Sequence, residues 1–146
     1  MKTKIFCDSA DIKIIKEFNN NSLVSGFTTN PSLMRKAGAK DYKNYSLKLL
    51  SVCKKKPISL EVFADKFDEM IRQANTINSW GKNVYVKIPV VNSKGLFSGA
   101  VINKLSNKGI KLNITAVYTV AQVRKILKNL NKKSKTIISI FAGRMG

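Results

Sequence analysis

Histidine is absent from this sequence of 146 residues, and the only cysteines are Cys7 and Cys53. Without histidine there can be no Ser-His-Asp triad, no imidazole acid–base catalyst and few zinc or iron sites. The two cysteines stand in unrelated contexts, so they predict neither a disulfide framework nor a metal site. We therefore expect a reduced, cytoplasmic protein that uses no metal and no cofactor.

Long hydrophobic runs are also missing. No stretch approaches the roughly 18 apolar residues that a membrane helix needs, and residues 1–9 lack the apolar centre of a signal peptide. Apolar residues still make up 44% of the chain, which is ordinary for a globular protein. We expect residues 1–146 to form a single domain with its own core and no membrane partner.

Acidic residues are scarce: 8 stand against 27 lysines and arginines, a net charge of +19. A charge of this size can indicate a nucleic-acid partner. The lysines are scattered, however, and the densest runs are residues 54–56 and 132–135. No basic motif interleaved with aromatics is present, so we interpret the charge as solvated helix faces. Nucleic acid is not the expected partner, and a basic binding domain remains the alternative.

Short apolar runs alternate with amphipathic segments along the whole chain, a pattern that predicts parallel strands joined by helices. Asp11 or Ser9 can cap the first helix, Thr119 can cap a later one, and Pro31 suits a first helical position after Asn30. The predicted strands are residues 4–7, 23–27, 58–63, 83–89, 111–115 and 136–141, and the clearest helices are residues 11–18, 65–80 and 119–130.

Such a sheet can be an open doubly wound sheet or a (β/α)8 barrel. No Gly-x-Gly-x-x-Gly segment or P-loop follows a strand, which disfavours a nucleotide-binding open sheet. A barrel has eight units, and six are counted here. The barrel interpretation therefore implies that this chain holds only about the first six βα units.

Each predicted strand carries polar residues near its carboxyl end, where barrel enzymes keep their active sites. A single polar residue there is usually a cap or turn residue. Lysine and glutamate inside apolar strands are rarer and suggest an ion pair or a site. The residues are Asp8, Thr28, Asn30, Glu61, Lys87, Asn113, Thr115 and Ser139.

Lys87 suits one chemistry in particular. Burial in an apolar strand disfavours the ammonium form, and a neutral amine attacks carbonyls to form a Schiff base. A protonated imine accepts electrons, so a neighbouring carbon–carbon bond can break without a metal. Asp8 and Glu61 can transfer protons in such a reaction.

These residues stand in segments that resemble the small class I transaldolases and the fructose-6-phosphate aldolases. The most specific pieces are Thr-Thr-Asn-Pro-Ser at 28–32 and Val-Lys-Ile-Pro at 86–89. The resemblance implies a (β/α)8 TIM barrel and a homo-oligomer. It also implies transfer of a dihydroxyacetone unit within the pentose phosphate pathway. The resembling segments are residues 5–11, 26–33, 59–62, 84–90, 112–119 and 139–144. The implied substrates are fructose 6-phosphate, sedoheptulose 7-phosphate, erythrose 4-phosphate and glyceraldehyde 3-phosphate.

The resemblance also assigns roles. Lys87 matches the Schiff-base lysine, Asp8 the acid–base group, and Glu61 with Thr115 the pair that holds a catalytic water. The other matches line the substrate site, and Arg144 among them is the expected phosphate ligand. These substrate-binding residues are Thr28, Asn30, Asn113, Ser139, Phe141 and Arg144.

Two positions separate the branches of the family. The aldolases carry glutamine in place of Glu61 and tyrosine in place of Phe141. The residues present here favour transaldolase, because phenylalanine cannot help to protonate the enamine intermediate. A fructose-6-phosphate aldolase of the same class and a catalytically impaired transaldolase fragment remain alternatives.

Overall fold

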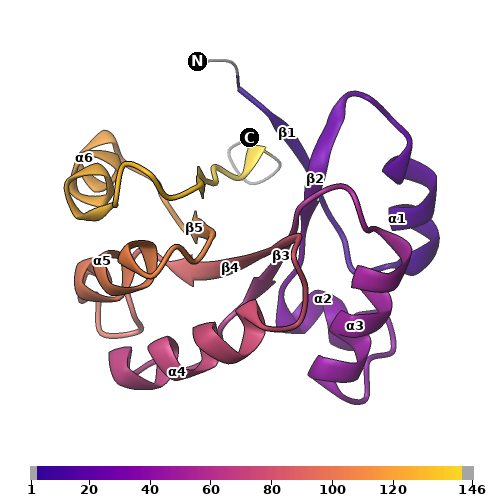
Figure 1. The fold of residues 1–146 in the computed structure, drawn as a ribbon, viewed down its shortest axis with the longest axis horizontal. Coiled ribbons are helices and arrows are strands. Elements are labelled where there is room, and N and C mark those ends of the chain that lie inside the picture. The colour runs from indigo at the N-terminus through magenta and orange to yellow at the C-terminus, as the bar shows by residue number, and fades with distance from the viewer. Residues whose placement is uncertain (1–2, 143–146) are drawn as a thin grey trace. The chain divides into compact units, whose positions relative to one another are not determined.

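The computed structural model describes residues 3–142, and in them parallel strands alternate with helices (Figure 1). The predicted fold class, a partial (β/α)8 barrel, is confirmed by this alternation and by the parallel pairing of neighbouring strands. None of the helices in this part of the chain is long and apolar enough to cross a membrane. The strands are β1 (Ile5–Asp8), β2 (Val24–Thr28), β3 (Ile58–Glu61), β4 (Val84–Pro89), β5 (Leu112–Thr115) and β6 (Thr136–Ile138). The helices are α1 (Ile12–Asn19), α2 (Pro31–Lys36), α3 (Tyr42–Val52), α4 (Phe67–Asn78), α5 (Gly99–Asn107) and α6 (Val120–Asn129).

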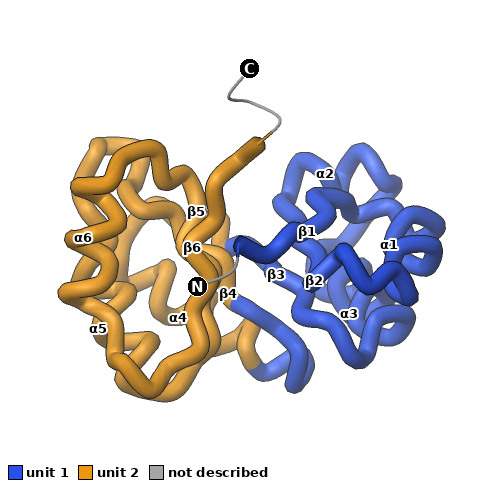
Figure 2. Tube along the Cα trace, turned by 90° about the horizontal axis from the view of Figure 1, so that it is seen from above, with its two compact units in different colours: residues 1–61, 79–85 blue, residues 62–78, 86–146 orange. Residues whose placement is uncertain are grey.

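The chain divides into two compact units, which Figure 2 shows in blue and orange. The first comprises residues 1–61 and 79–85. In it β1 pairs with β2 and β2 with β3, all parallel, with Asp8 opposite Thr28 and Thr28 opposite Ser59. Ile15, Phe27 and Leu49 are fully buried and form part of the core between the strands and their helices.

The second unit comprises residues 62–78 and 86–146. Here the larger part of β4 pairs with β5 and β5 with β6, again parallel. Lys87 lies opposite Asn113, and Pro89 opposite Thr115. Parallel strands in register carry their paired side chains on the same face, so the polar residues at these strand ends share a face.

The helix starts follow local chemistry, as predicted. Asp11 caps α1 by accepting hydrogen bonds from two backbone amides, and Asn30 caps α2 with Pro31 in its first turn. Thr119 and Gln122 form a reciprocal capping box at the start of α6. These three predictions are confirmed.

Several predicted boundaries are wrong. The sixth strand ends at Ile138, so Ser139 and Phe141 follow the strand rather than lying on it. The third strand ends at Glu61 instead of continuing to Phe63. Helix α4 begins at Phe67 and not at Asp65, because the Asp65 side chain is engaged elsewhere.

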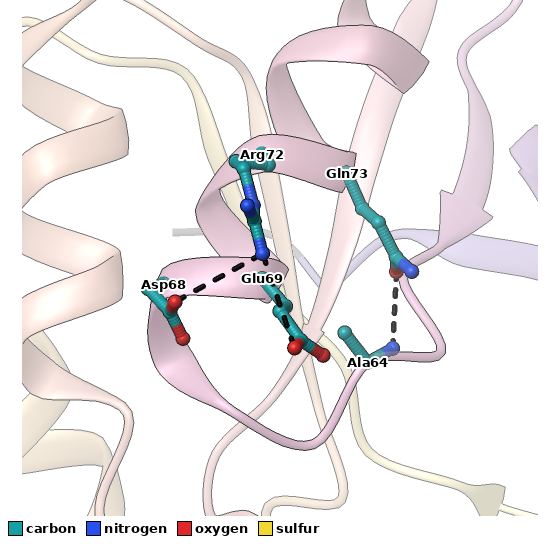
Figure 3. Close-up of polar contacts among 5 residues, drawn as sticks. All are labelled: Ala64, Asp68, Glu69, Arg72 and Gln73. Carbon is teal, nitrogen blue, oxygen red and sulfur yellow. Dashed lines mark hydrogen bonds and ion pairs between the residues drawn. The ribbon is translucent and has the colours of Figure 1, made fainter.

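The segment between β3 and α4 is held by side chains at both ends. The Gln73 side-chain oxygen accepts hydrogen bonds from the amides of Phe63 and Ala64, each 3.0 Å long. Figure 3 shows the Ala64 contact beside the exposed ion pairs that join Arg72 to Asp68 and Glu69. Such exposed pairs contribute little to stability, so of the contacts in Figure 3 the Gln73 hydrogen bond orders this segment more than the ion pairs do.

Asp65 holds the same segment to the turn after β4. Its carboxylate accepts from the Ser93 amide at 2.7 Å and from the Ser93 hydroxyl at 2.8 Å. These bonds, the amide first, lower the pKa of Asp65. The folded carboxyl therefore ionises more readily than the unfolded one.

Because the pKa of Asp65 is lower in the folded protein, its hydrogen bonds to Ser93 are predicted to weaken in acid. The hydrogen bonds between Asp65 and Ser93 are intact above the unfolded carboxyl pKa of about 3.9. They break as the pH falls through the lower pKa of the folded protein. We expect the Ser93 amide resonance to move in this acid range, as followed by NMR titration. The Asp65→Asn variant should lose that movement. If the chemical shift of the Ser93 amide stays constant in the wild type, the hydrogen bonds between Asp65 and Ser93 are contradicted.

Candidate active site

In the first unit, Asp8 and Thr28 are hydrogen-bonded at the ends of neighbouring strands. The register of β1 and β2 pairs the two residues. The Thr28 hydroxyl donates to Asp8 Oδ1 over 2.7 Å. Thr28 is buried at 7% exposure, whereas Asp8 is exposed. The hydroxyl thus fixes the orientation of a carboxylate that solvent or a ligand can reach.

We expect this bond to contribute measurably to stability. Thr28→Val keeps the side-chain shape and removes the donor, so the free energy of unfolding should fall by about 1 kcal/mol. Thr28→Ser should retain most of that stability. The measurement is urea denaturation of both variants and of Asp8→Ala, combined in a double-mutant cycle. A coupling energy of zero between positions 8 and 28 would contradict the assignment.

Glu61 is the last residue of β3 in this unit, and Asn30 lies shortly after the end of β2. The Asn30 side-chain oxygen accepts from the Leu33 amide at 2.8 Å, which leaves its NH2 group to donate elsewhere. The Glu61 carbonyl accepts from the Tyr42 hydroxyl at 2.9 Å. Burial raises the pKa of Tyr42, so this hydroxyl stays protonated and remains a donor.

In the second unit, Lys87 is enclosed on β4. It is only 2% exposed, although lysine is almost never this deeply buried. Its Nζ lies 5.7 Å from the centroid of the Phe141 ring. The backbone around it is paired on both sides, with the Lys87 carbonyl accepting from the Val62 amide. The strand therefore holds the lysine in a fixed, nearly dry position.

Polar groups from two further elements share the face of Lys87. Asn113 is fully buried on β5, and its Oδ1 accepts from the Ser139 hydroxyl at 2.7 Å. That bond directs the amide NH2 of Asn113 as a donor. Thr115 is 3% exposed, and its hydroxyl has no hydrogen-bond partner among the described residues. A buried unpaired hydroxyl is costly and is typical of a place where a ligand or water binds.

The structure thus groups the predicted site residues in two sets. The second unit brings together Lys87, Asn113, Thr115, Ser139 and Phe141, and the first brings together Asp8 and Thr28. Arg144 lies outside the described residues. Among residues 3–142, no group of three or more His, Cys, Asp or Glu side chains could hold a metal ion.

Two residues that hold the segment after β3 in place were not predicted to have that role. Asp65 and Gln73 tie down the segment after β3, and Asp65 reaches across to the turn after β4 that bears Ser93. The sequence interpretation placed both in a helix, where an early acidic residue is common. A Ser in a loop gives no sequence signal that it will bind an aspartate 28 residues earlier.

Comparison with known proteins identifies a family over nearly the whole chain. Residues 5–146 match the family described as Transaldolase/Fructose-6-phosphate aldolase. Curated relatives named probable transaldolase are 37% identical over 142 residues in Streptococcus agalactiae, Dehalococcoides mccartyi and Methanococcus vannielii. Each alignment covers 97% of this chain and 61% or 62% of the relative. The chain thus spans about three-fifths of the length of these relatives.

Proposed function

Because this chain belongs to the transaldolase and fructose-6-phosphate aldolase family, we propose that it transfers a dihydroxyacetone unit between sugar phosphates through a Schiff base on Lys87. The observation that carries the proposal is the enclosed amine of Lys87. It shares one face of the sheet with the Asn113 amide and with the Thr115 hydroxyl, which has no hydrogen-bond partner within residues 3–142. An amine removed from water and flanked by fixed donors is suited to condense with a polar ketone.

The first half-reaction begins at this amine. Lys87 Nζ attacks the C2 carbonyl of a ketose phosphate, and the carbinolamine loses water to give a protonated imine. Asp8 takes the proton of the C4 hydroxyl, and the C3–C4 bond breaks. The electron pair of that bond moves to C3 and forms an enamine, while C4 leaves as the aldehyde of the shortened sugar. The second half-reaction reverses these steps with another aldehyde, and water then hydrolyses the imine.

The remaining residues bind and direct water or hydroxyls. Glu61 and Thr115 hold the water that adds to or leaves the carbinolamine. This role suits the Thr115 hydroxyl, which is buried and has no partner in the described part of the chain. Asn30 and Asn113 donate amide hydrogens to hydroxyls of the three-carbon unit, and Ser139 orients Asn113 by the 2.7 Å bond. Arg144 binds the phosphate.

Phe141 favours transfer over release. Its ring stands 5.7 Å from Lys87 Nζ, and phenylalanine has no proton to give to the enamine carbon. The enamine then persists until an acceptor aldehyde arrives. Free dihydroxyacetone, formed without any acceptor, would instead identify the aldolase reaction.

Borohydride trapping tests the proposal. Incubation with fructose 6-phosphate and sodium borohydride should leave a three-carbon adduct, and peptide mass spectrometry should locate it on Lys87. The Lys87→Arg variant keeps a long polar side chain, but a guanidinium cannot form the imine, so this variant should carry no adduct at this position. A folded wild-type protein that stays unlabelled, or is labelled equally at exposed lysines, would overturn the proposal.

A further inference from the structure

Two tyrosines begin the inward face of helix α3, which lies in the first unit (Figure 2). Positions 42, 45, 46, 49 and 50 follow the i, i+3, i+4, i+7, i+8 spacing of a single helix face. Of these residues Ser46, Leu49 and Leu50 are buried, and Tyr42 and Tyr45 are half-buried. The two phenols therefore extend the buried stripe to the amino-terminal turn of α3.

The direction of α3 places these phenols at the carboxyl ends of the strands. The segment that contains α3 leads from the carboxyl end of β2 to the amino end of β3, and these two strands are parallel. The helix therefore runs back along the sheet, with its first turn nearest the carboxyl ends. Asp8 and Glu61 are the last residues of β1 and β3, so the tyrosines start at the edge that carries both carboxylates of the proposed mechanism.

The Tyr42 hydroxyl binds the backbone of Glu61. It donates to the Glu61 carbonyl oxygen over 2.9 Å. The Tyr42 ring is itself paired with the ring of Trp80, with centroids 6.0 Å apart and planes inclined by 55°. Tilted pairs at this separation are favourable for aromatic rings. The phenol is therefore held by packing, and its hydroxyl holds the end of β3 from a fixed position.

The Tyr45 hydroxyl binds the segment that follows Asp8. It lies 2.9 Å from the Ala10 carbonyl oxygen and 3.3 Å from the Ala37 carbonyl oxygen, so the nearer Ala10 is the main acceptor of its proton. Ala10 is only 2% exposed and stands two residues after Asp8. Tyr45 therefore holds the backbone close to the carboxylate that is proposed to act as the base.

Packing alone does not require these two hydroxyls. Phenylalanine would fill the same face of α3, and a hydroxyl removed from water is costly unless it is hydrogen-bonded. Burial raises the pKa of both phenols, and the charges of Glu61 and of Asp11 raise the pKa of Tyr42 and of Tyr45 respectively as smaller causes. Both phenols therefore stay protonated and continue to donate to the strand ends.

We propose that the two tyrosines are positioning residues for two different steps of the reaction. Tyr42 keeps Glu61 in place for the water of imine formation. Tyr45 keeps Asp8 in place for the proton transfer that accompanies cleavage of the C3–C4 bond. The inference rests on the proposed function, which gives the two carboxylates these roles. Displacing a reacting group by about 1 Å can slow a step by about 10²-fold, so a contact with the neighbouring backbone is sufficient for such an effect.

The test compares the full-length wild type with Tyr42→Phe, Tyr45→Phe and the control Ser46→Ala. Ser46 is fully buried on the same face of α3, and its hydroxyl donates to the Tyr42 carbonyl over 2.7 Å, within the helix. The control therefore perturbs α3 without releasing a strand end. Each protein is incubated with a ketone and quenched with sodium borohydride at timed intervals, and mass spectrometry measures the adduct on Lys87.

Two ketones separate the two steps. Dihydroxyacetone reports imine formation alone, whereas fructose 6-phosphate reports imine formation followed by cleavage. Tyr42→Phe should trap both ketones about tenfold more slowly than the wild type. Tyr45→Phe should trap dihydroxyacetone at the wild-type rate, but its six-carbon adduct should give way to the three-carbon adduct about tenfold more slowly. Ser46→Ala should match the wild type with both ketones.

Three results would overturn the proposal. They are slower trapping of dihydroxyacetone by Tyr45→Phe, unchanged trapping by Tyr42→Phe, and equal slowing of both ketones in all three variants, which is the pattern of a merely structural role. Circular dichroism and urea denaturation establish that each variant is folded. A folded wild type that carries no adduct with either ketone would overturn the proposed function itself, so the two failures are distinguishable.

Discussion

Replacing Gly26 by alanine is expected to lower the free energy of unfolding by about 2–3 kcal/mol or more. Gly26 lies in β2, and a Cβ there would stand 2.7 Å from the Phe6 ring, from Pro57 Cγ and from the Pro57 carbonyl oxygen. The carbonyl oxygen is backbone and accepts a hydrogen bond from the Phe27 amide, so it cannot move aside without breaking the sheet. Urea denaturation of the variant would measure the loss.

Gly81→Ala is the matched control. A Cβ at Gly81 would approach Leu50 Cδ1 to 3.3 Å, and that methyl group is the end of a flexible side chain. Alanine also restricts the unfolded chain, which offsets a small strain. We expect a change of less than about 1 kcal/mol at this position. Similar losses in both variants would mean that the approach of β2 to Pro57 is not as tight as described.

The elements that could be predicted from the sequence depend on contacts near in sequence. Asp11, Asn30 and Thr119 cap helices through amides two or three residues away, and a capping pattern is visible in the sequence itself. The alternation of apolar runs and amphipathic helices gave the fold class for the same reason. The predicted strand ends were less accurate. Where β3 and β6 stop depends on hydrogen bonds with backbone groups that are distant in the sequence.

The polar residues at the strand ends could be read from the sequence, but the contacts between them could not. Thr28 is predicted to bind substrate, and the structure shows that its hydroxyl donates to Asp8. This contact depends on the pairing of β1 with β2, which no local pattern reveals. Ser139 was expected to line the site, and it binds the Asn113 side chain. Both contacts join residues 20 or more positions apart, so they follow from the strand pairing alone.

The hydrogen bonds between α5 and the end of α6 could not be predicted for the same reason. Asn103 Nδ2 donates to the Asn129 carbonyl, and Asn131 Nδ2 donates to Asn107 Oδ1. These bonds join residues 26 and 24 positions apart, and they form only because α5 packs against α6.

A large functional effect is expected at Asp8. In the Asp8→Asn variant, Lys87 can still condense with fructose 6-phosphate, because imine formation does not require the C4 proton to leave. Cleavage of the C3–C4 bond does require a base, and loss of a positioned base slows such a step by about 10²–10⁴-fold. Borohydride should therefore trap a six-carbon adduct on Lys87, where the wild type carries a three-carbon one.

Intact-protein mass spectrometry after timed quenching measures the two adducts, and dihydroxyacetone provides the control. This three-carbon ketone needs no cleavage, so wild type and Asp8→Asn should trap it equally. The asparagine amide still offers an oxygen to the Thr28 hydroxyl, so the 2.7 Å contact between strands can persist and the fold should be intact. A three-carbon adduct formed from fructose 6-phosphate at the wild-type rate would remove Asp8 from the reaction. Loss of both adducts would assign it to imine formation instead, since only that step is common to the two substrates.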